Sequence, residues 1–222
     1  QMSGVSSRPV TNPAIGKELF NYSTIDDAFG MCFTFDSQRF YMISFPSEGA
    51  SWLFNENSEL WTSLGYDVVG GAHLARSVRD VYGTQLVCDR RNGNIYELDS
   101  ETYTDNGDTI QRIRTTRSID GKDYNLSGKT LTMDRLELVI DPGNSLVSGD
   151  SKIIMEFSDD SGKTWSTQEF QSVGEQGEFG YKLEWFCLGS FYRRMIRFTM
   201  SDAIKWVLVS CNADIEVGVG AP

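Results

Sequence analysis

The chain has 222 residues, of which 40% are hydrophobic and 12% aromatic, so it can form one large or two small domains with a hydrophobic core. Its net charge of −11 disfavours a duplex-binding protein, because such a protein needs a basic face that neutralises phosphates. No apolar run reaches the roughly 18–20 residues of a membrane-spanning helix, and the first residues lack the apolar stretch of a signal peptide.

The chain begins with Gln1, and we expect it to be a fragment of a longer protein. One short helix is expected near its start. Asn12 is a suitable N-cap and Pro13 suits the first helical position, so the helix should run to about Tyr22. After it the pattern predicts short strands that contain aromatic residues, with spacing typical of β-propeller blades. The strands expected in the two blade-like sets cover residues 30–35, 39–45, 51–55 and 60 onward, and then 70–77, 83–89 and 95–99. Two blades cannot close a propeller, so further blades would come from upstream sequence or from other subunits.

The pattern changes between residues 118 and 128, which are loop-like. Beyond them, longer strands alternate apolar and polar residues, as in an antiparallel sandwich. We therefore predict an all-β chain, with propeller-like blades over residues 1–120 and an antiparallel β-sandwich over residues 121–222. Three sets of side chains should each share one face of a strand: Tyr181, Leu183, Trp185 and Cys187; Ile196, Phe198 and Met200; and Ile204, Trp206 and Leu208.

Residues 158–165 match S-x-D-x-G-x-T-W, the pattern of the Asp-box hairpin, at every specified position. In this turn, Asp or Ser side chains accept hydrogen bonds from nearby backbone N–H groups, and Gly adopts a φ that other residues resist. The Trp packs beneath the loop, so we expect its side chain to be substantially buried. Asp boxes occur in sialidase-like propellers and in many other β-proteins, so the motif indicates a structural device rather than chemistry. The residues of this structural Asp box are Ser158, Asp160, Gly162, Thr164 and Trp165.

The four cysteines lie far apart, each in an apolar strand-like run, and form no C-x-x-C pair. Buried free thiols are favoured over disulfides, and these spacings do not suit zinc. The residues concerned are Cys32, Cys88, Cys187 and Cys211.

No catalytic, metal or cofactor site is predicted. The single histidine, His73, cannot build a histidine-rich metal site, and no Ser stands in G-x-S-x-G. The Gly-Lys-Thr fragments at residues 128–130 and 162–164 lack the earlier glycine of a phosphate-binding loop. Asn106 and Gly107 suit the centre of a hairpin turn rather than a calcium loop. We therefore expect no enzyme activity and no cofactor.

Two arginine clusters are the remaining candidates for a binding surface. Interface salt bridges, solvated faces and substrate binding all account for them. Paired carboxylates of a glycosidase are the remaining enzyme hypothesis, whereas the arginine triad and Tyr nucleophile of a sialidase cannot be assigned. The possible interface residues are Arg112, Arg114, Arg117, Arg193, Arg194 and Arg197.

Several segments resemble the tail hub proteins of short-tailed phages, also called packaged-DNA stabilisation proteins. They are residues 40–46, 52–54, 60–61, 89–99, 103–110, 112–114, 157–166, 174–179, 188–189 and 201–202. The resemblance spans most of the chain in the family's order and corresponds to the C-terminal part of such a protein. Family members are longer, and Ser161 stands in the Asp-box turn where we expect Gly.

The resemblance implies a structural role in the virion tail. Family members form a ring, commonly six-fold, below the portal and its adaptor; they retain the packaged DNA, attach the tail needle and tailspikes, and later let the DNA leave. We therefore expect a homo-oligomeric ring, assembled in the host cytoplasm, through which DNA passes without sequence-specific binding. Two alternatives remain: a glycan-binding or sialidase-like β-propeller adhesin or hydrolase, and a secreted β adhesin, which would need disulfides.

Overall fold

The computed structural model describes residues 2–3, 6–7, 9–65, 71–124, 128–141, 151–174, 180–205 and 207–218. The chain divides into two compact units, Gln1–Asn106 and Gly107–Pro222. Apart from one α-helix and two short 3-10 helices, η1 (Pro46–Glu48) and η2 (Gly121–Tyr124), the regular elements of the described residues are strands. The fold is therefore all-β, as the sequence predicts.

The helix of the N-terminal unit, α1 (Pro13–Phe20), begins where its cap predicts. Asn12 Oδ1 accepts a hydrogen bond from the backbone N–H of Ile15 at 2.9 Å, which satisfies one of the free donors of the first turn. Ile15 is the buried residue of the helix.

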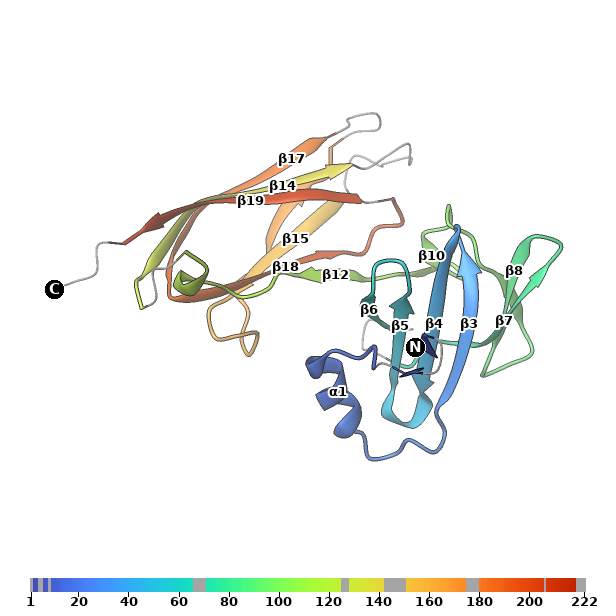
Figure 1. Ribbon diagram of the computed structural model, residues 1–222. Helices are drawn as coiled ribbons and strands as arrows, with labels where there is room; N and C mark the ends of the chain where they lie inside the picture. The colour runs from blue at the N-terminus through green and yellow to red at the C-terminus, as the bar shows by residue number, and fades with distance from the viewer. Residues whose placement is uncertain are drawn as a thin grey trace. The chain divides into compact units, whose positions relative to one another are not determined.

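Two antiparallel sheets make up most of the N-terminal unit (Figure 1). The first contains β3 (Phe29–Phe35), β4 (Gln38–Phe45), β5 (Ala50–Asn55) and β6 (Leu60–Leu64), each paired with the next. The second contains β7 (Ala75–Val81), β8 (Thr84–Asp89) and β9 (Ile95–Glu97), and β1 (Met2–Ser3) pairs with β2 (Ser6–Ser7). Neither sheet closes on itself within the described residues, so the propeller stays a prediction.

The two faces of the four-stranded sheet have different neighbours. One face, which includes Met42 and Leu53, lines a cavity of about 200 Å³ together with Val78 of β7. The other face contacts the N-terminal segment through two indole groups. Trp61 Nε1 donates to the carbonyl of Val10 at 3.0 Å, and Trp52 Nε1 donates to the hydroxyl of Tyr22 at 2.9 Å.

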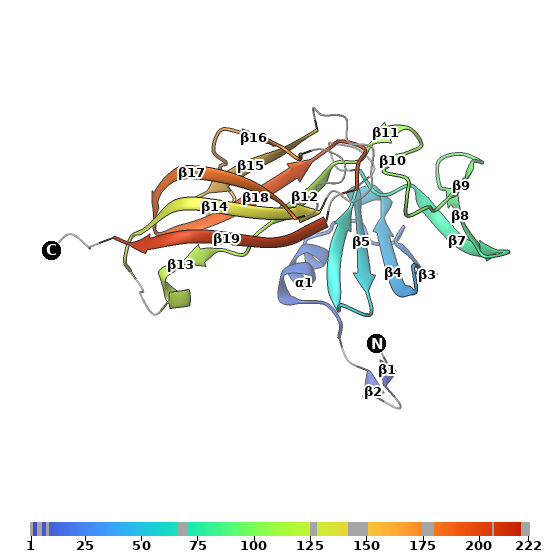
Figure 2. The same cartoon turned by 90° about the horizontal axis from the view of Figure 1, so that it is seen from above.

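The C-terminal unit is a β-sandwich of two antiparallel sheets (Figures 1 and 2). One sheet has the order β17 (Tyr181–Phe191), β14 (Leu131–Asp141), β19 (Val207–Val217). The other has the order β12 (Arg112–Thr115), β18 (Arg193–Met200), β15 (Lys152–Ser158), β16 (Glu169–Ser172), and β13 (Ile119–Asp120) also pairs with β18. The short hairpin of β10 (Thr104–Asp105) and β11 (Asp108–Thr109) turns at Asn106 and Gly107, both with positive φ, which confirms the predicted turn.

The sandwich core lies between its two sheets. Strand β14 shows how the sequence builds it, because Leu131 and Met133 are buried, and then Leu136, Leu138 and Ile140. An irregularity in pairing between Met133 and Arg135 shifts the alternation by one residue, as a β-bulge does. The predicted face of Ile196, Phe198 and Met200 is confirmed, since all three are buried in this core.

One other predicted face needs correction, and the third is described only in part. In β17, Leu183 and Trp185 are buried, but Cys187 is exposed and Leu188 is buried instead. Cys187 has a φ of 58°, and this left-handed residue reverses the order of the faces. In the third set, Ile204 is buried before β19 begins and Leu208 of β19 packs against the same core, while Trp206 lies outside the described residues.

The division into units also differs from the predicted ranges of residues 1–120 and 121–222. β12 and β13 precede residue 121, yet both pair with β18 of the sandwich. Because of this pairing, the segment that contains β12 and β13 belongs to the C-terminal unit.

The four cysteines are free thiols, but none is buried as expected. Cys32, Cys187 and Cys211 are exposed and Cys88 is half-buried. The apolar residues that flank each cysteine in the sequence therefore do not predict that the cysteine itself is buried.

Candidate functional site

The loop between β15 and β16 is organised around one carboxylate. Asp160 Oδ1 accepts hydrogen bonds from the backbone N–H groups of Lys163 and Thr164, both at 2.9 Å, and from the hydroxyl of Ser158 at 2.8 Å. Its Oδ2 accepts from the Thr164 hydroxyl at 2.6 Å, while the Gly162 N–H donates to Ser158 Oγ at 2.8 Å. The Thr164 hydroxyl and N–H, followed by the Ser158 hydroxyl, hold the pKa of Asp160 far below its usual range. The Asp160 carboxylate thus takes the place of backbone carbonyls as the acceptor for N–H groups of the turn.

Two consecutive residues of this loop have a left-handed backbone. Ser161 has a φ of 66° and Gly162 a φ of 87°. Gly adopts such a φ without steric cost, whereas Ser does not. The strain therefore lies at Ser161.

Trp165 is half-buried at the end of the loop. The guanidinium carbon of Arg197 lies 3.9 Å from the centre of its ring, a cation–π contact. Arg197 also donates to Glu156 Oε2 from Nε at 3.0 Å and from Nη2 at 2.8 Å. The indole is thus covered by a paired arginine.

A second arginine of β18, Arg194, fixes the start of the loop from inside the sandwich. Its side chain is only 2% exposed and holds Asp159 in a bidentate pair, Nε to Oδ1 at 2.7 Å and Nη2 to Oδ2 at 2.8 Å. Nη1 donates to the carbonyl of Leu188 at 2.7 Å, and the guanidinium lies over the rings of Phe157 and Phe191 at 4.1 and 4.3 Å. Sequence reasoning missed Asp159, because the pair joins residues 35 positions apart and no local pattern marks it.

The structure separates the six predicted interface arginines. Arg194 and Arg197 make the contacts within the sandwich just described. Arg112 donates to the backbone carbonyls of Ile204, at 2.6 Å, and of Asp202, and so holds the segment before β19. Arg114, Arg117 and Arg193 are exposed, and an interface role for them stays a prediction.

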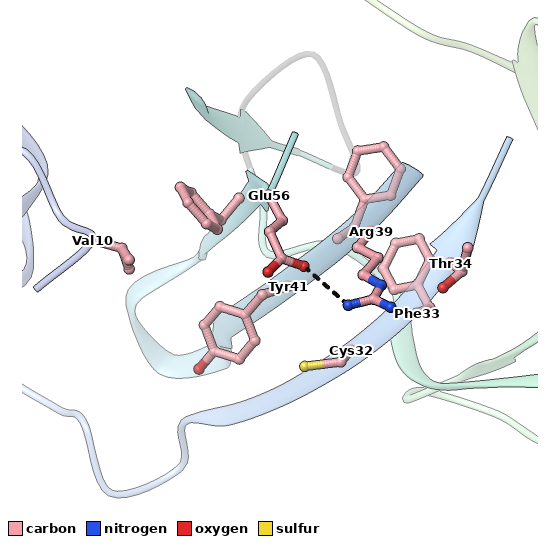
Figure 3. A pocket seen from close by; sticks show the side chains of 9 residues that line it. Val10, Cys32, Phe33, Thr34, Arg39, Tyr41 and Glu56 are labelled. Atoms are coloured by element: carbon pink, nitrogen blue, oxygen red, sulfur yellow. Dashed lines mark ion pairs between the residues drawn. The ribbon is translucent and has the colours of Figure 1, made fainter. Parts of the chain in front are cut away.

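The N-terminal unit has a groove that sequence reasoning did not find (Figure 3). It has a volume of about 620 Å³ and lies on one face of the four-stranded sheet. Cys32, Tyr41 and Phe54 contribute to its lining. Arg39 and Glu56, 3.9 Å apart, lie at the same groove. A Cβ on Gly30 would lie 2.8 Å from the Tyr41 hydroxyl, so this glycine makes room for the ring. The groove can take an apolar or aromatic group next to a charged pair.

Two features are absent from the described residues. They contain no group of three or more His, Cys, Asp or Glu residues that could hold a metal ion. They also contain no helix that is long and apolar enough to span a membrane.

The C-terminal unit matches a known family. Residues 116–216 match the family model described as the β-sandwich of bacteriophage P22 Gp10. A search of curated proteins gave no match.

The sandwich is accordingly a domain of a phage tail structural protein, a component of the virion. More particularly, residues 116–216 are similar to the β-sandwich of bacteriophage P22 Gp10. This confirms the resemblance to the tail hub proteins of short-tailed phages, for the C-terminal part of such a protein.

Proposed function

We propose that the protein is a non-catalytic subunit of a phage tail hub, which closes the portal and adaptor channel, stabilises the packaged DNA and anchors the tail needle and tailspikes. The observation that carries this proposal is the match of the sandwich, residues 116–216, to the P22 Gp10 family. The internal contacts of the sandwich support a structural role, because Arg112, Arg194 and Arg197 all bind groups of their own domain.

The charge of the chain supports a channel that DNA crosses without binding. With a net charge of −11, the surface repels the phosphate backbone and offers few sites for counterion release. A hub that retains DNA in this way acts as a closed barrier rather than as a DNA-binding protein.

The subunits of this hub would form a homo-oligomeric ring, a hexamer by resemblance, in contact with the portal adaptor. Arg114, Arg117 and Arg193 are exposed on the sandwich and are our candidates for contacts with acidic groups of neighbouring subunits or tail proteins. Arginine suits such contacts, because its planar guanidinium binds carboxylates through two hydrogen bonds.

Reconstitution tests the proposal. The purified protein is added to DNA-filled heads that carry the adaptor but lack the hub, and assembly is followed by electron microscopy and DNA retention by nuclease protection. We expect density below the adaptor and protected DNA. Arg114→Glu should weaken assembly, while the charge-matched control Arg79→Glu in β7 should not. Heads that bind no protein, and that lose DNA equally fast with and without it, would contradict the proposal.

The groove of the N-terminal unit favours a second candidate, a glycan-binding tail protein. Tyr41 and Phe54 offer aromatic surface, and Arg39 with Glu56 offers polar groups at the same groove. A glycan array separates the two candidates: binding that Tyr41→Ala abolishes would favour the adhesin, and no binding to any glycan would remove it.

A further inference from the structure

Strand β19 presents a long open edge in the C-terminal unit. It has 11 residues and pairs with β14 along its length, and no described strand pairs with its other side. Figure 2 shows β14 between β17 and β19. An edge of this kind carries unpaired N–H and C=O groups that can bind a further strand.

The opposite edge of the same sheet is partly covered. Gln171 of β16 donates from Nε2 to the carbonyl of Glu184 in β17 at 3.0 Å, which joins the two sheets on that side. Positive φ values at Cys187 and Gly189 also interrupt β17. The edges therefore differ, and within the described part of the chain the outer backbone groups of β19 pair with no strand over many residues.

β19 carries only some of the features that usually protect an edge. Proteins block edges with charged side chains, Lys above all, or with Pro, bulges or short strands; β19 carries Asp214 and Glu216 but neither Lys nor Pro. Its pairing with β14 is irregular near Val209 and again opposite Met133–Arg135, where the extra residue belongs to β14; Ser210–Val217 of β19 themselves contain no extra residue. Val209 is 61% and Val217 41% exposed, so apolar side chains also face solvent here.

A slot beside this edge opens into the sandwich. It has a volume of about 260 Å³ and lies between β12 and β19, with Leu138 and Phe198 of the two sheets in its lining. Cys211 of β19 and Arg114 of β12 line the slot too, and both are exposed. The slot can hold one apolar side chain of a strand placed along β19.

We propose that the β19 edge binds an extended segment of another protein, which adds a strand to the sheet and places an apolar side chain in the slot. The outer face of β19 carries Asp214, which already pairs with Arg135 at 2.8 Å, and Glu216, so a basic side chain placed opposite Glu216 on the added strand is complementary to this face. A second copy of β19 is a poor fit, because it would place Asp214 and Glu216 of both copies on one face of adjacent strands. This inference concerns the sandwich edge alone and does not depend on the tail assignment.

A peptide probe tests the proposal with the full chain. A ten-residue peptide that alternates Val and Lys is titrated by fluorescence anisotropy, and amide hydrogen exchange locates its binding. We expect protection of alternate β19 amides, those whose N–H groups face away from β14. A peptide alternating Val and Glu should bind about tenfold more weakly, because it faces the carboxylates.

Two variants of Cys211 separate binding at the β19 edge from a general electrostatic attraction between the peptide and the chain. Cys211→Lys places a charge at the slot and should weaken binding of the Val–Lys peptide about tenfold, whereas Cys211→Ser should bind as the wild type does. Thermal unfolding checks that both variants fold. The proposal is overturned if the peptide binds without protecting β19, if Cys211→Lys binds normally, or if the outward β19 amides are already protected in the free chain. It is equally overturned if the peptide does not bind, or if the wild type forms dimers that Cys211→Lys dissociates.

Discussion

At the scale of single residues, the sandwich depends on Arg194. A buried guanidinium is stable only when its donors are satisfied, and here Asp159 and the Leu188 carbonyl accept from it while two aromatic rings cover its faces. Arg194 thereby links the loop of residues 158–165 to the end of β17.

Arg194→Ala should lower the free energy of unfolding by about 3 kcal/mol, because it removes a bidentate pair and leaves a space among aromatic rings. Arg194→Lys should recover little of this loss, since an ammonium cannot make both bonds to Asp159. Urea unfolding measures both. Arg193→Ala is the control, because Arg193 is half-exposed and lies 3.7 Å from Asp120; it should cost at most about 0.5 kcal/mol. Equal effects of Arg194→Ala and Arg193→Ala would contradict the role of Arg194.

The left-handed pair in the same loop predicts two substitutions with opposite effects. Ser161→Gly should raise the free energy of unfolding by about 0.5–1 kcal/mol, since it removes steric strain at a φ of 66°. Gly162→Ala should lower it by about 1 kcal/mol or more, because the same strain is added at a φ of 87°. Thermal unfolding of the two variants and the wild type checks both signs. A stabilising Gly162→Ala would mean that the turn has another conformation in solution.

At the scale of the element, the β15–β16 hairpin should depend on pH through Asp160. Its folded-state pKa is lowered, so the carboxylate contributes stability that is fully present above the unfolded pKa of about 3.9. This contribution is lost as the pH falls from there toward the lower folded pKa. Asp160→Asn should therefore be less stable than the wild type at pH 7, and the difference should shrink below about pH 4.

Unfolding free energies at pH 7, 4 and 3 measure this difference. Asp108→Asn serves as the control for the loss of one exposed carboxylate, because Asp108 is exposed at the β10–β11 hairpin, outside this loop. A constant gap between Asp160→Asn and the wild type over this range would contradict the assignment.

At the scale of the whole molecule, the two compact units should unfold separately. Leu136 is fully buried in the sandwich and Met42 is 2% exposed in the N-terminal unit. Leu136→Ala and Met42→Ala should each destabilise their own unit by about 2–5 kcal/mol. Calorimetry of the full chain should show two transitions, with each variant lowering only one of them. A single transition that both variants shift would mean that the units fold together.

Local chemistry in the sequence accounts for much of the fold. The Asn12 cap, the Asn106–Gly107 turn and the buried face of Ile196, Phe198 and Met200 all follow from neighbours a few residues apart. The resemblance of the C-terminal part to tail hub proteins could likewise be read from segments in order along the chain.

Features that join distant parts of the chain could not be read in this way. The bulge between Met133 and Arg135 and the left-handed Cys187 change which residues face the core, and both arise where β14 and β17 pair. Cys211 lies in an apolar run, yet it is exposed because β19 has no partner on its outer side among the described residues.

The same distinction applies to the hairpin of residues 158–165 and its surroundings. Its pattern of Ser, Asp, Gly, Thr and Trp can be recognised from sequence, because the hydrogen bonds of Asp160 reach no further than four residues. The pairing of Asp159 with Arg194 spans 35 residues and exists only because β15 and β18 lie side by side in one sheet. The sequence thus determines the local turn and the period of each strand. The tertiary structure decides which charge is buried, which face is reversed and which edge stays open, because those outcomes depend on contacts between strands that are distant in the chain.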